Sequence, residues 1–202
     1  MKRATSVVGD LAGLPDHNYG PTSLGWWGVI GFMLIEAMGF VLAIGTYYYL
    51  VPYERSWPPT APVPPLPWAT AFLVVGVLSE LPNAWVNRMA RQQRLAAVQW
   101  GLTLMSVLGL VMLVLRGFEL VAMNARWDQN AYGSIVWALL LLHTMHISTD
   151  VFDSIVLAVL VWTKKVDGRK FSDVSDNALY WHFIVWSWLV LYLVIYWTPR
   201  WL

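Results

Sequence analysis

The 202-residue sequence contains no cysteine. This absence excludes disulfide bonds, iron–sulfur ligation, covalent attachment of a c-type haem and thiolate-ligated copper within the chain. Charged residues are also scarce: they make up 12% of the chain, which is about half their share in an average soluble domain. The net charge of +1 gives no indication of a nucleic-acid partner, and we expect none.

Apolar residues dominate instead. They make up 58% of the chain and are concentrated in five stretches, which run over residues 26–50, 68–89, 96–118, 134–162 and 178–198. A bilayer has a hydrocarbon core about 30 Å thick, which a helix of ~20 residues crosses, so each stretch is long enough to span it once. A water-soluble domain could not bury this much continuous apolar surface. The sequence therefore predicts an all-α integral membrane bundle of five transmembrane helices.

The basic residues predict the orientation of this bundle. If the N-terminus is inside, nine basic residues fall in inner segments and four in outer ones, as the positive-inside rule favours. The inner nine are Lys2, Arg3, Arg88, Arg91, Arg94, Lys164, Lys165, Arg169 and Lys170. Most of the 14 Trp and nine Tyr lie near predicted span ends, where aromatic side chains anchor at the lipid headgroups. We therefore predict an inside N-terminus and an outside C-terminus.

The sequence predicts a single domain preceded by an N-terminal tail. Residues 1–25 are expected to form an inner-side N-terminal tail, and residues 26–202 the five-span bundle. No apolar stretch follows Lys2 and Arg3 in the tail, so a secretory signal is not predicted. A proline-rich outer loop over residues 52–67 is expected to be stiff and extended. No internal repeat is evident, which disfavours an inverted-repeat transporter.

Two glutamates lie at membrane depth, where an ionisable side chain is costly unless it is paired or faces a cavity. Glu36 lies near the middle of the first predicted span, and Glu80 lies at a similar depth in the second. Glu36 has no evident basic partner in the sequence, so it is either a protonated hydrogen-bond donor between helices or a slow proton-exchange site. We take both glutamates as candidates for a proton site or a lipid-binding cleft.

The fourth predicted span carries four polar residues on one side. His143, His146, Asp150 and Asp153 follow the spacing i, i+3, i+7 and i+10. We expect an interhelical cluster of hydrogen bonds; a proton-conducting role and a metal site are the alternatives, and a metal site would need a third helix. His182 in the fifth span lies at a different depth from the two fourth-span histidines. We therefore expect no haem, no metal ligand and no catalytic residue in this chain.

Several motifs follow one another along the chain. They are Glu36 with Phe40 and Tyr47 to Tyr49, Trp57-Pro58-Pro59, Pro67, Glu119, His143 with His146, Tyr180-Trp181-His182-Phe183, and Trp188 with Tyr196. In this order and spacing the sequence resembles subunit III of the haem-copper oxidases, in its five-span form, over residues 25–198. It departs from the family pattern at Thr144 and Asp150, where glycine is usual, and at Val185, where an acid is usual.

The resemblance implies an accessory, non-redox subunit of a cytochrome c oxidase, which supports oxygen reduction and proton uptake. It implies catalytic subunit I and electron-entry subunit II as partners, with haem and copper in those partners and no cofactor in this chain. It also implies phospholipid bound in a cleft of this chain, near Glu36. The expected location is a bacterial plasma membrane, with the mitochondrial inner membrane as the alternative.

Other functions fit parts of the sequence. The chain could be an accessory subunit of a quinol oxidase or of a nitric oxide reductase, which a subunit III sequence hardly distinguishes. A stand-alone membrane metalloprotein would use His143, His146, Asp150 and Asp153. A small transporter or channel would need a water-lined path through the five helices.

Overall fold

The computed structural model describes residues 24–59, 62–163 and 168–202, so the predicted N-terminal tail lies almost entirely outside the described residues. The described residues contain helices and no β-strand. The helical elements are α1 (Leu24–Leu50), a 3-10 turn (Val51–Tyr53), α2 (Leu66–Arg91), α3 (Leu95–Ala122), α4 (Ala131–Thr163), α5 (Gly168–Tyr192), a π-helical segment (Leu193–Trp197) and α6 (Thr198–Trp201). Among the described residues, five helices are long and apolar enough to cross a membrane, which confirms the predicted all-α class with five spans.

Each predicted span lies within one continuous helical stretch, and the largest difference is at the start of α5. This helix begins at Gly168, well before residue 178, where the apolar pattern begins. Its first turns contain the polar residues Asp173, Asp176 and Asn177, so the apolar pattern did not include this part of the helix. All three line a cleft shared with α1 and α4, where polar side chains are tolerated in a membrane helix.

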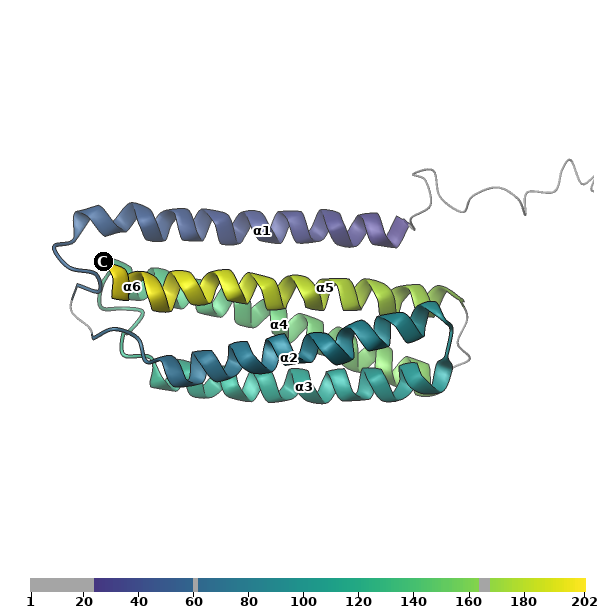
Figure 1. Cartoon of the computed structure of the whole chain (residues 1–202). Helices are drawn as coiled ribbons and strands as arrows, with labels where there is room; N and C mark the ends of the chain where they lie inside the picture. The colour runs from purple at the N-terminus through teal and green to yellow at the C-terminus, as the bar shows by residue number, and fades with distance from the viewer. Residues whose placement is uncertain (1–23, 60–61, 164–167) are drawn as a thin grey trace, which may run out of the picture.

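Helices α2, α3, α4 and α5 pack into a bundle, and α1 lies along one side of it against α4 and α5 (Figure 1). Helix α1 begins at the end of the bundle where α4 connects to α5, here called the α4–α5 end; the opposite end is the α6 end. Of its described apolar side chains, Phe40 and Tyr47 are buried, whereas Leu34 and Ile35 are 66% and 73% exposed. In a membrane, lipid or a partner chain must cover this apolar face.

Two glycines of α3 allow the neighbouring helices to approach closely. A Cβ atom on Gly101 would lie 2.3 Å from Val86 of α2, and one on Gly109 would lie 2.4 Å from Val151 of α4. Both contacts are too short for any side chain, so these positions require glycine unless the helices move apart. Small residues at helix crossings are the usual means of close packing in membranes.

Aromatic residues close the α6 end of the bundle. Trp57 of the proline-rich loop, followed by Pro58 and Pro59, is buried between Tyr47 and Tyr132. Its ring centroid lies 5.1 Å from that of Tyr47 and 4.9 Å from that of Tyr132, and both rings are nearly perpendicular to it. Arg200 donates to Pro64 O at 2.6 Å, which holds the same loop against the C-terminus. The loop is thus packed on the bundle, although its start forms a 3-10 turn rather than the extended chain expected there.

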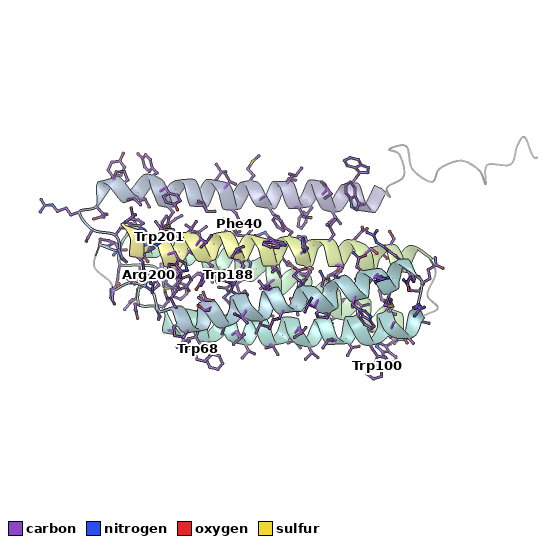
Figure 2. All side chains as sticks on the ribbon, in the orientation of Figure 1. Phe40, Trp68, Trp100, Trp188, Arg200 and Trp201 are labelled. Carbon is purple, nitrogen blue, oxygen red and sulfur yellow. The ribbon has the colours of Figure 1, made fainter. Side chains whose placement is uncertain are left out.

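Exposed tryptophans mark both ends of the outer surface of α2 and α3 (Figure 2). Trp68 at the α6 end is 40% exposed and stacks on Phe118, and Trp100 at the α4–α5 end is 66% exposed and meets Trp162 edge-on. This placement matches the aromatic belts found where membrane helices meet the lipid headgroups.

Candidate functional site

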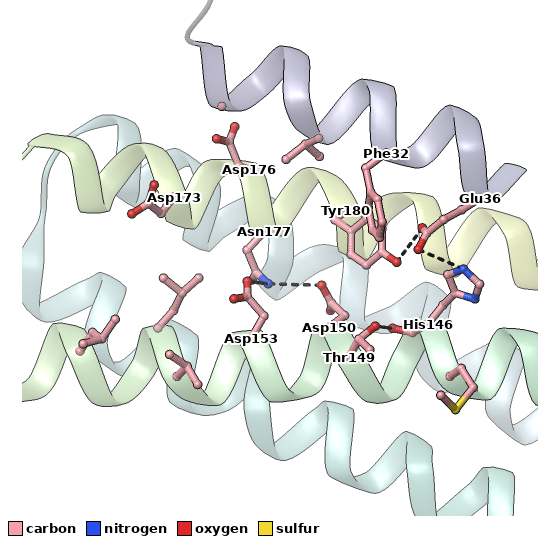
Figure 3. Close-up of a pocket in the computed structure, with 16 residues that line it drawn as sticks. Phe32, Glu36, His146, Thr149, Asp150, Asp153, Asp173, Asp176, Asn177 and Tyr180 are labelled. Carbon is pink, nitrogen blue, oxygen red and sulfur yellow. Dashed lines mark hydrogen bonds and ion pairs between the residues drawn. The ribbon is translucent and has the colours of Figure 1, made fainter.

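Glu36 lies at the centre of a hydrogen-bonded group that joins three helices (Figure 3). Its Oε1 lies 3.0 Å from Nε2 of His146 on α4, and Tyr180 of α5 donates its hydroxyl to Oε2 at 2.7 Å. Both the Glu36 and the His146 side chains are about nine-tenths buried. The sequence offered no evident basic partner for Glu36; the fold provides one from a distant part of the chain.

The hydrogen bonds decide how many protons this pair holds. His146 Nδ1 lies 2.5 Å from Leu142 O, and because a carbonyl only accepts, Nδ1 carries a hydrogen. One further proton then lies between Nε2 and Glu36 Oε1, on either the acid or the imidazole. The pair is either a neutral acid donating to a neutral imidazole or a carboxylate facing an imidazolium. In both cases His146 and Tyr180 hold the Glu36 side chain in place, because both contacts can form with the charged and with the neutral carboxyl group.

His143 was predicted to lie in the same hydrogen-bonded cluster as His146, but it contacts a different set of residues. It is completely buried, with Nδ1 3.0 Å from Arg116 Nη2 and Nε2 3.1 Å from Ile184 O. A guanidinium only donates and a carbonyl only accepts, so Nδ1 accepts from Arg116 and Nε2 donates to Ile184 O. Both ring nitrogens are therefore occupied, and neither is open to a metal or a haem iron.

Asp150 and Asp153 share a single amide group. Asn177 Nδ2 donates to Asp150 Oδ1 at 3.2 Å and to Asp153 Oδ2 at 3.3 Å. Ser154 donates to Asn177 Oδ1 at 3.2 Å, which turns the NH₂ group of the amide towards the two acids. Asp150 is 2% exposed, and its other oxygen, Oδ2, is buried without a hydrogen-bond partner among the described residues. The polar stripe of α4 thus divides into separate groups rather than forming one cluster.

A cleft of about 620 Å³ connects His146, Asp150 and Asp153 with α1 and α5 (Figure 3). Five carboxyl residues line it, namely Glu36, Asp150, Asp153, Asp173 and Asp176. No lysine or arginine is among its described lining residues, and the rest of its wall combines apolar side chains with the polar side chains of His146, Thr149, Asn177 and Tyr180. The acids extend from the first turns of α5 to the middle of α1. The cleft can therefore hold cations or protons and an apolar chain.

A metal centre receives no support from this arrangement. In the part of the chain that the structure describes, no three His, Asp or Glu side chains converge closely enough to hold a metal ion. His143 points into the bundle, His146 is bound to Glu36 and Leu142, and the two aspartates face Asn177. The four residues of the stripe therefore do not form the ligand set that a metalloprotein would need.

Comparison with known proteins settles the family. Residues 12–200 match the model of the family described as cytochrome c oxidase subunit III. The chain belongs to the cytochrome c oxidase subunit III family. Members of this family are non-catalytic membrane subunits of multi-subunit haem-copper oxidases, so partner subunits are implied. The predicted resemblance is confirmed.

Individual relatives come from two kinds of oxidase. The chain is 24% identical to cytochrome c oxidase subunit 3 of Drosophila yakuba, over 96% of this chain and 76% of that protein. It is 27% identical to the same subunit of Lumbricus terrestris, over 85% of this chain and 69% of that protein. It is 23% identical to cytochrome bo(3) ubiquinol oxidase subunit 3 of Pseudomonas aeruginosa, over 90% of this chain and 89% of that protein.

Glu80, the second glutamate at membrane depth, is not among the residues that line the cleft. It lies between α2 and α5, where His182 Nδ1 is 2.8 Å from its Oε2. Trp186 Nε1 donates to His182 Nε2 at 2.9 Å, so His182 carries its hydrogen on Nδ1 and donates to Glu80. The His182 side chain is 53% exposed, so this pair lies at the surface of the bundle.

The other motif residues of α5 are structural anchors. Trp181 donates its indole N–H to Ser79 Oγ of α2 at 2.9 Å, deep in the bundle. Phe183 packs beside Tyr180, with ring centroids 6.0 Å apart. Val185, where the family pattern has an acid, lies beside the Gly76 position of α2.

Sequence analysis missed a buried ion pair. Arg116 Nη1 lies 2.7 Å from Glu119 Oε2, with the two side chains 1% and 2% exposed, and Tyr196 donates to the other Glu119 oxygen. The Arg116 guanidinium carbon lies 4.1 Å from the Phe72 ring centroid and 3.9 Å from that of Trp188. Arg116 is one of the four basic residues that the charge pattern assigns to the outer side. Its i, i+3 spacing from Glu119 was the signal that could have revealed the pair.

Proposed function

We propose that this chain is the accessory, non-redox subunit III of a respiratory terminal oxidase of the cytochrome c type. Its partners would be catalytic subunit I and electron-entry subunit II, which carry the haem and copper. The observation that carries this proposal is the family match over residues 12–200. The polar residues of the chain add support, because most of them bond to one another across helices rather than face an open metal position.

The role within the complex is to support proton uptake and to bind phospholipid. Support comes from the acidic cleft, in which Asp173 and Asp176 lie towards the α4–α5 end and Glu36 lies at the middle of α1. Glu36 and His146 share a proton that either group can carry, which suits a site that exchanges protons. The apolar wall of the same cleft suits a lipid chain.

A quinol oxidase is the second candidate for the complex. The observation that favours it is the similarity to the Pseudomonas aeruginosa ubiquinol oxidase subunit, which is 23% identical over 90% of this chain. Subunit III does not carry electrons in either proposal, so the rest of the assignment is unchanged. For either candidate, the proposed location is a bacterial plasma membrane with the N-terminus inside, as the distribution of basic residues favours.

The test is purification of the tagged chain in a mild detergent, followed by a reduced-minus-oxidised visible spectrum and metal analysis. Haem and copper that accompany larger subunits, and are lost when those subunits are stripped away, are the expected result. Oxygen consumption with reduced cytochrome c and with a quinol then distinguishes the two donors. A chain that purifies alone with its own bound metal would overturn the proposal.

A further inference from the structure

The turn between α2 and α3 carries three arginines and no acidic residue. Arg88 and Arg91 lie in the last turn of α2, Arg94 directly precedes α3, and all three are exposed. Residues 81–118 contain no aspartate or glutamate. In the part of the chain that the structure describes, none of the three arginines forms an ion pair, and Arg91 donates only to the neutral amide of Asn87, at 3.3 Å. Three positive charges therefore share one turn without a counter-charge from the described residues.

Arginines elsewhere in the chain are held differently. Arg116 and Arg126 each face a carboxyl group, and Arg200 donates to two backbone carbonyl groups. The dipole of α3 disfavours a cation at Arg94, the N-cap position of this helix. The positive-inside rule favours basic residues at this end of the bundle, but it does not account for the lack of acids, because acids contribute little to that rule. The cluster is therefore complementary to an anion from outside the chain.

Backbone hydrogen bonds fix the turn that presents these arginines. Gln93 N donates to Ala90 O at 2.9 Å, and Arg94 N donates to Met89 O at 3.1 Å. Gln93 itself has a φ of 54°, in the left-handed region. This is the pattern of a Schellman motif, which ends α2 and directs the chain into α3. The backbone positions of the three arginines are thus set before a ligand binds, which lowers the entropic cost of gathering them around it.

An exposed aromatic and apolar surface continues from the turn along α3. Trp100 is 66% exposed and meets Trp162 of α4 edge-on, with ring centroids 5.4 Å apart (Figure 2). Leu104 and Val107 are also exposed and lie on the same side of α3 as Trp100, at the spacing i, i+4 and i+7. Tryptophan in such a place marks the level of the lipid headgroups. The arginines thus lie at the depth of lipid phosphates, and the apolar side chains lie at the depth of acyl chains.

This arrangement selects a phospholipid over other anions. The planar guanidinium group forms paired hydrogen bonds with phosphate oxygens. Basic residues at the membrane surface attract anionic headgroups, which are already present at that depth. A soluble anion such as inorganic phosphate would make no use of the apolar face of α3, and an acidic segment of a partner protein would have to be brought to this level.

We propose that the α2–α3 turn binds the phosphate group of an anionic phospholipid, with Arg88, Arg91 and Arg94 as its donors and the exposed face of α3 against an acyl chain. The site lies away from the acidic cleft, which α1, α4 and α5 form, and it has the opposite charge (Figure 1). The inference goes beyond the proposed function, because it requires only that this end of α2 and α3 lies at a membrane surface.

The experiment uses the complex as it purifies, with its lipids removed in a mild detergent. It is mixed with phosphatidylglycerol or phosphatidylcholine whose identical acyl chains carry a photoreactive group, and the cross-linked peptides are mapped. Both lipids contain a phosphate, but only phosphatidylglycerol has a net negative charge. Cross-links to residues 95–111 of α3 should be at least about tenfold more frequent with phosphatidylglycerol. Each arginine is expected to contribute about fivefold, so Arg94→Gln lowers the preference by that factor and the triple glutamine variant reduces it to about one.

Two further variants keep the result interpretable. Replacing the same three arginines with lysine preserves the charge that directs membrane orientation, and this variant should keep a preference between those of the wild type and the triple glutamine variant. Arg126→Gln removes an exposed arginine from the α3–α4 loop, at the α6 end of the bundle, and should match the wild type.

Three results would overturn the proposal. One is equal cross-linking of the two lipids to α3 in the wild type, or a preference that the glutamine variant retains. Another is loss of the cross-link on adding inorganic phosphate but not chloride at equal ionic strength, which would assign the turn to a soluble anion. The third is an absence of lipid at α3 together with arginines protected from phenylglyoxal, which would assign the turn to an acidic partner protein. The haem spectrum of the same samples tests the subunit III assignment separately.

Discussion

Glu36 of α1 and His146 of α4 hold one proton between them across a 3.0 Å contact. Helix α1 buries few of its described apolar side chains, so this contact and the neighbouring bond to Tyr180 are its main polar attachment near mid-membrane. The pair thus fastens α1 to the bundle at a point where both side chains line the cleft. The proposed proton role of Glu36 and the packing of α1 therefore involve the same carboxyl group.

Glu36→Ala is the first prediction. It leaves His146 Nε2 and the Tyr180 hydroxyl without their hydrogen-bond partner, at a cost of about 1–3 kcal/mol in the free energy of unfolding. In the assembled oxidase, the haem spectra should be unchanged, while inactivation during turnover is faster or proton uptake slower. Stopped-flow proton uptake and the decay of oxygen consumption measure this. Altered haem spectra with normal durability would contradict the assigned role.

The matched control for Glu36→Ala is Glu54→Gln. Glu54 is an exposed carboxyl just after α1, so its loss changes the charge of the chain without removing a contact inside the cleft. Durability and proton uptake should match the wild type. A similar loss in both variants would attribute the effect to overall charge.

The buried ion pair gives the second prediction. Arg116→Met leaves Glu119 as an unpaired buried charge, and removing one partner of such a pair typically costs about 3–5 kcal/mol. Arg116→Met combined with Glu119→Gln should recover much of this loss, because the amide keeps an acceptor for Tyr196 and removes the charge. The measurement is the fraction of folded protein by size-exclusion chromatography after heating. If the double variant is less stable than the single one, the charge is not the cause.

An exposed arginine provides the control for this pair. Arg126 lies in the α3–α4 loop, outside the membrane-spanning helices, and its guanidinium lowers the pKa of Asp128 by a hydrogen bond. Because both side chains are exposed to solvent, Arg126→Met should shift the unfolding midpoint little. The loss of stability in Arg116→Met therefore reports burial rather than the removal of an arginine.

Gly109→Ala is the third prediction. The added Cβ would lie 2.4 Å from Val151 Cγ2, and Val151 is buried and stiff, so α3 and α4 must separate. Overpacking of this kind costs about 1–3 kcal/mol, which for a chain of this size lowers the midpoint by about 2–4 °C per kcal/mol. Gly117→Ala on the same helix has no atom within 4 Å of the new Cβ and should be neutral or slightly stabilising. Equal midpoints for the two variants would refute the close contact.

The Trp181–Ser79 bond gives the fourth prediction. Trp181→Phe keeps an aromatic ring but removes the indole N–H that donates to Ser79 on α2. The Ser79 hydroxyl still donates to Gly76 O at 2.6 Å, so no buried donor is left unpaired; the lost bond costs about 1 kcal/mol, and the space left by the indole in a fully buried site adds to it. Ser79→Ala leaves the Trp181 N–H buried without an acceptor, at about 1–3 kcal/mol. Thermal midpoints of the two single variants and the double variant in one detergent test the bond: the double variant should lose less than the sum of the single losses, and full additivity would argue against the bond.

The sequence by itself determined the spans and the family. Apolar runs of this length are stable only as membrane-spanning helices, and the motifs and their order can be read along the chain without knowing its fold. It could not show that α5 begins at Gly168, since an apolar-run search cannot tell a polar helix face in a cleft from a loop. The i, i+3 spacing of Arg116 and Glu119 was visible in the sequence, but the burial of the pair was not. Burial depends on which other helices surround the two side chains.

The tertiary structure decided which polar groups meet. On α4, residues that share a side differ enough in direction that His143 faces Arg116 while His146 faces Glu36. The pairing of Glu80 with His182, and the sharing of Asn177 by Asp150 and Asp153, likewise depend on how α2, α4 and α5 are rotated against one another. Helical periodicity gives the side of a helix on which a residue lies, whereas the neighbour on that side is set by long-range packing. For that reason the candidates were visible in the sequence, but the cleft that joins them was not.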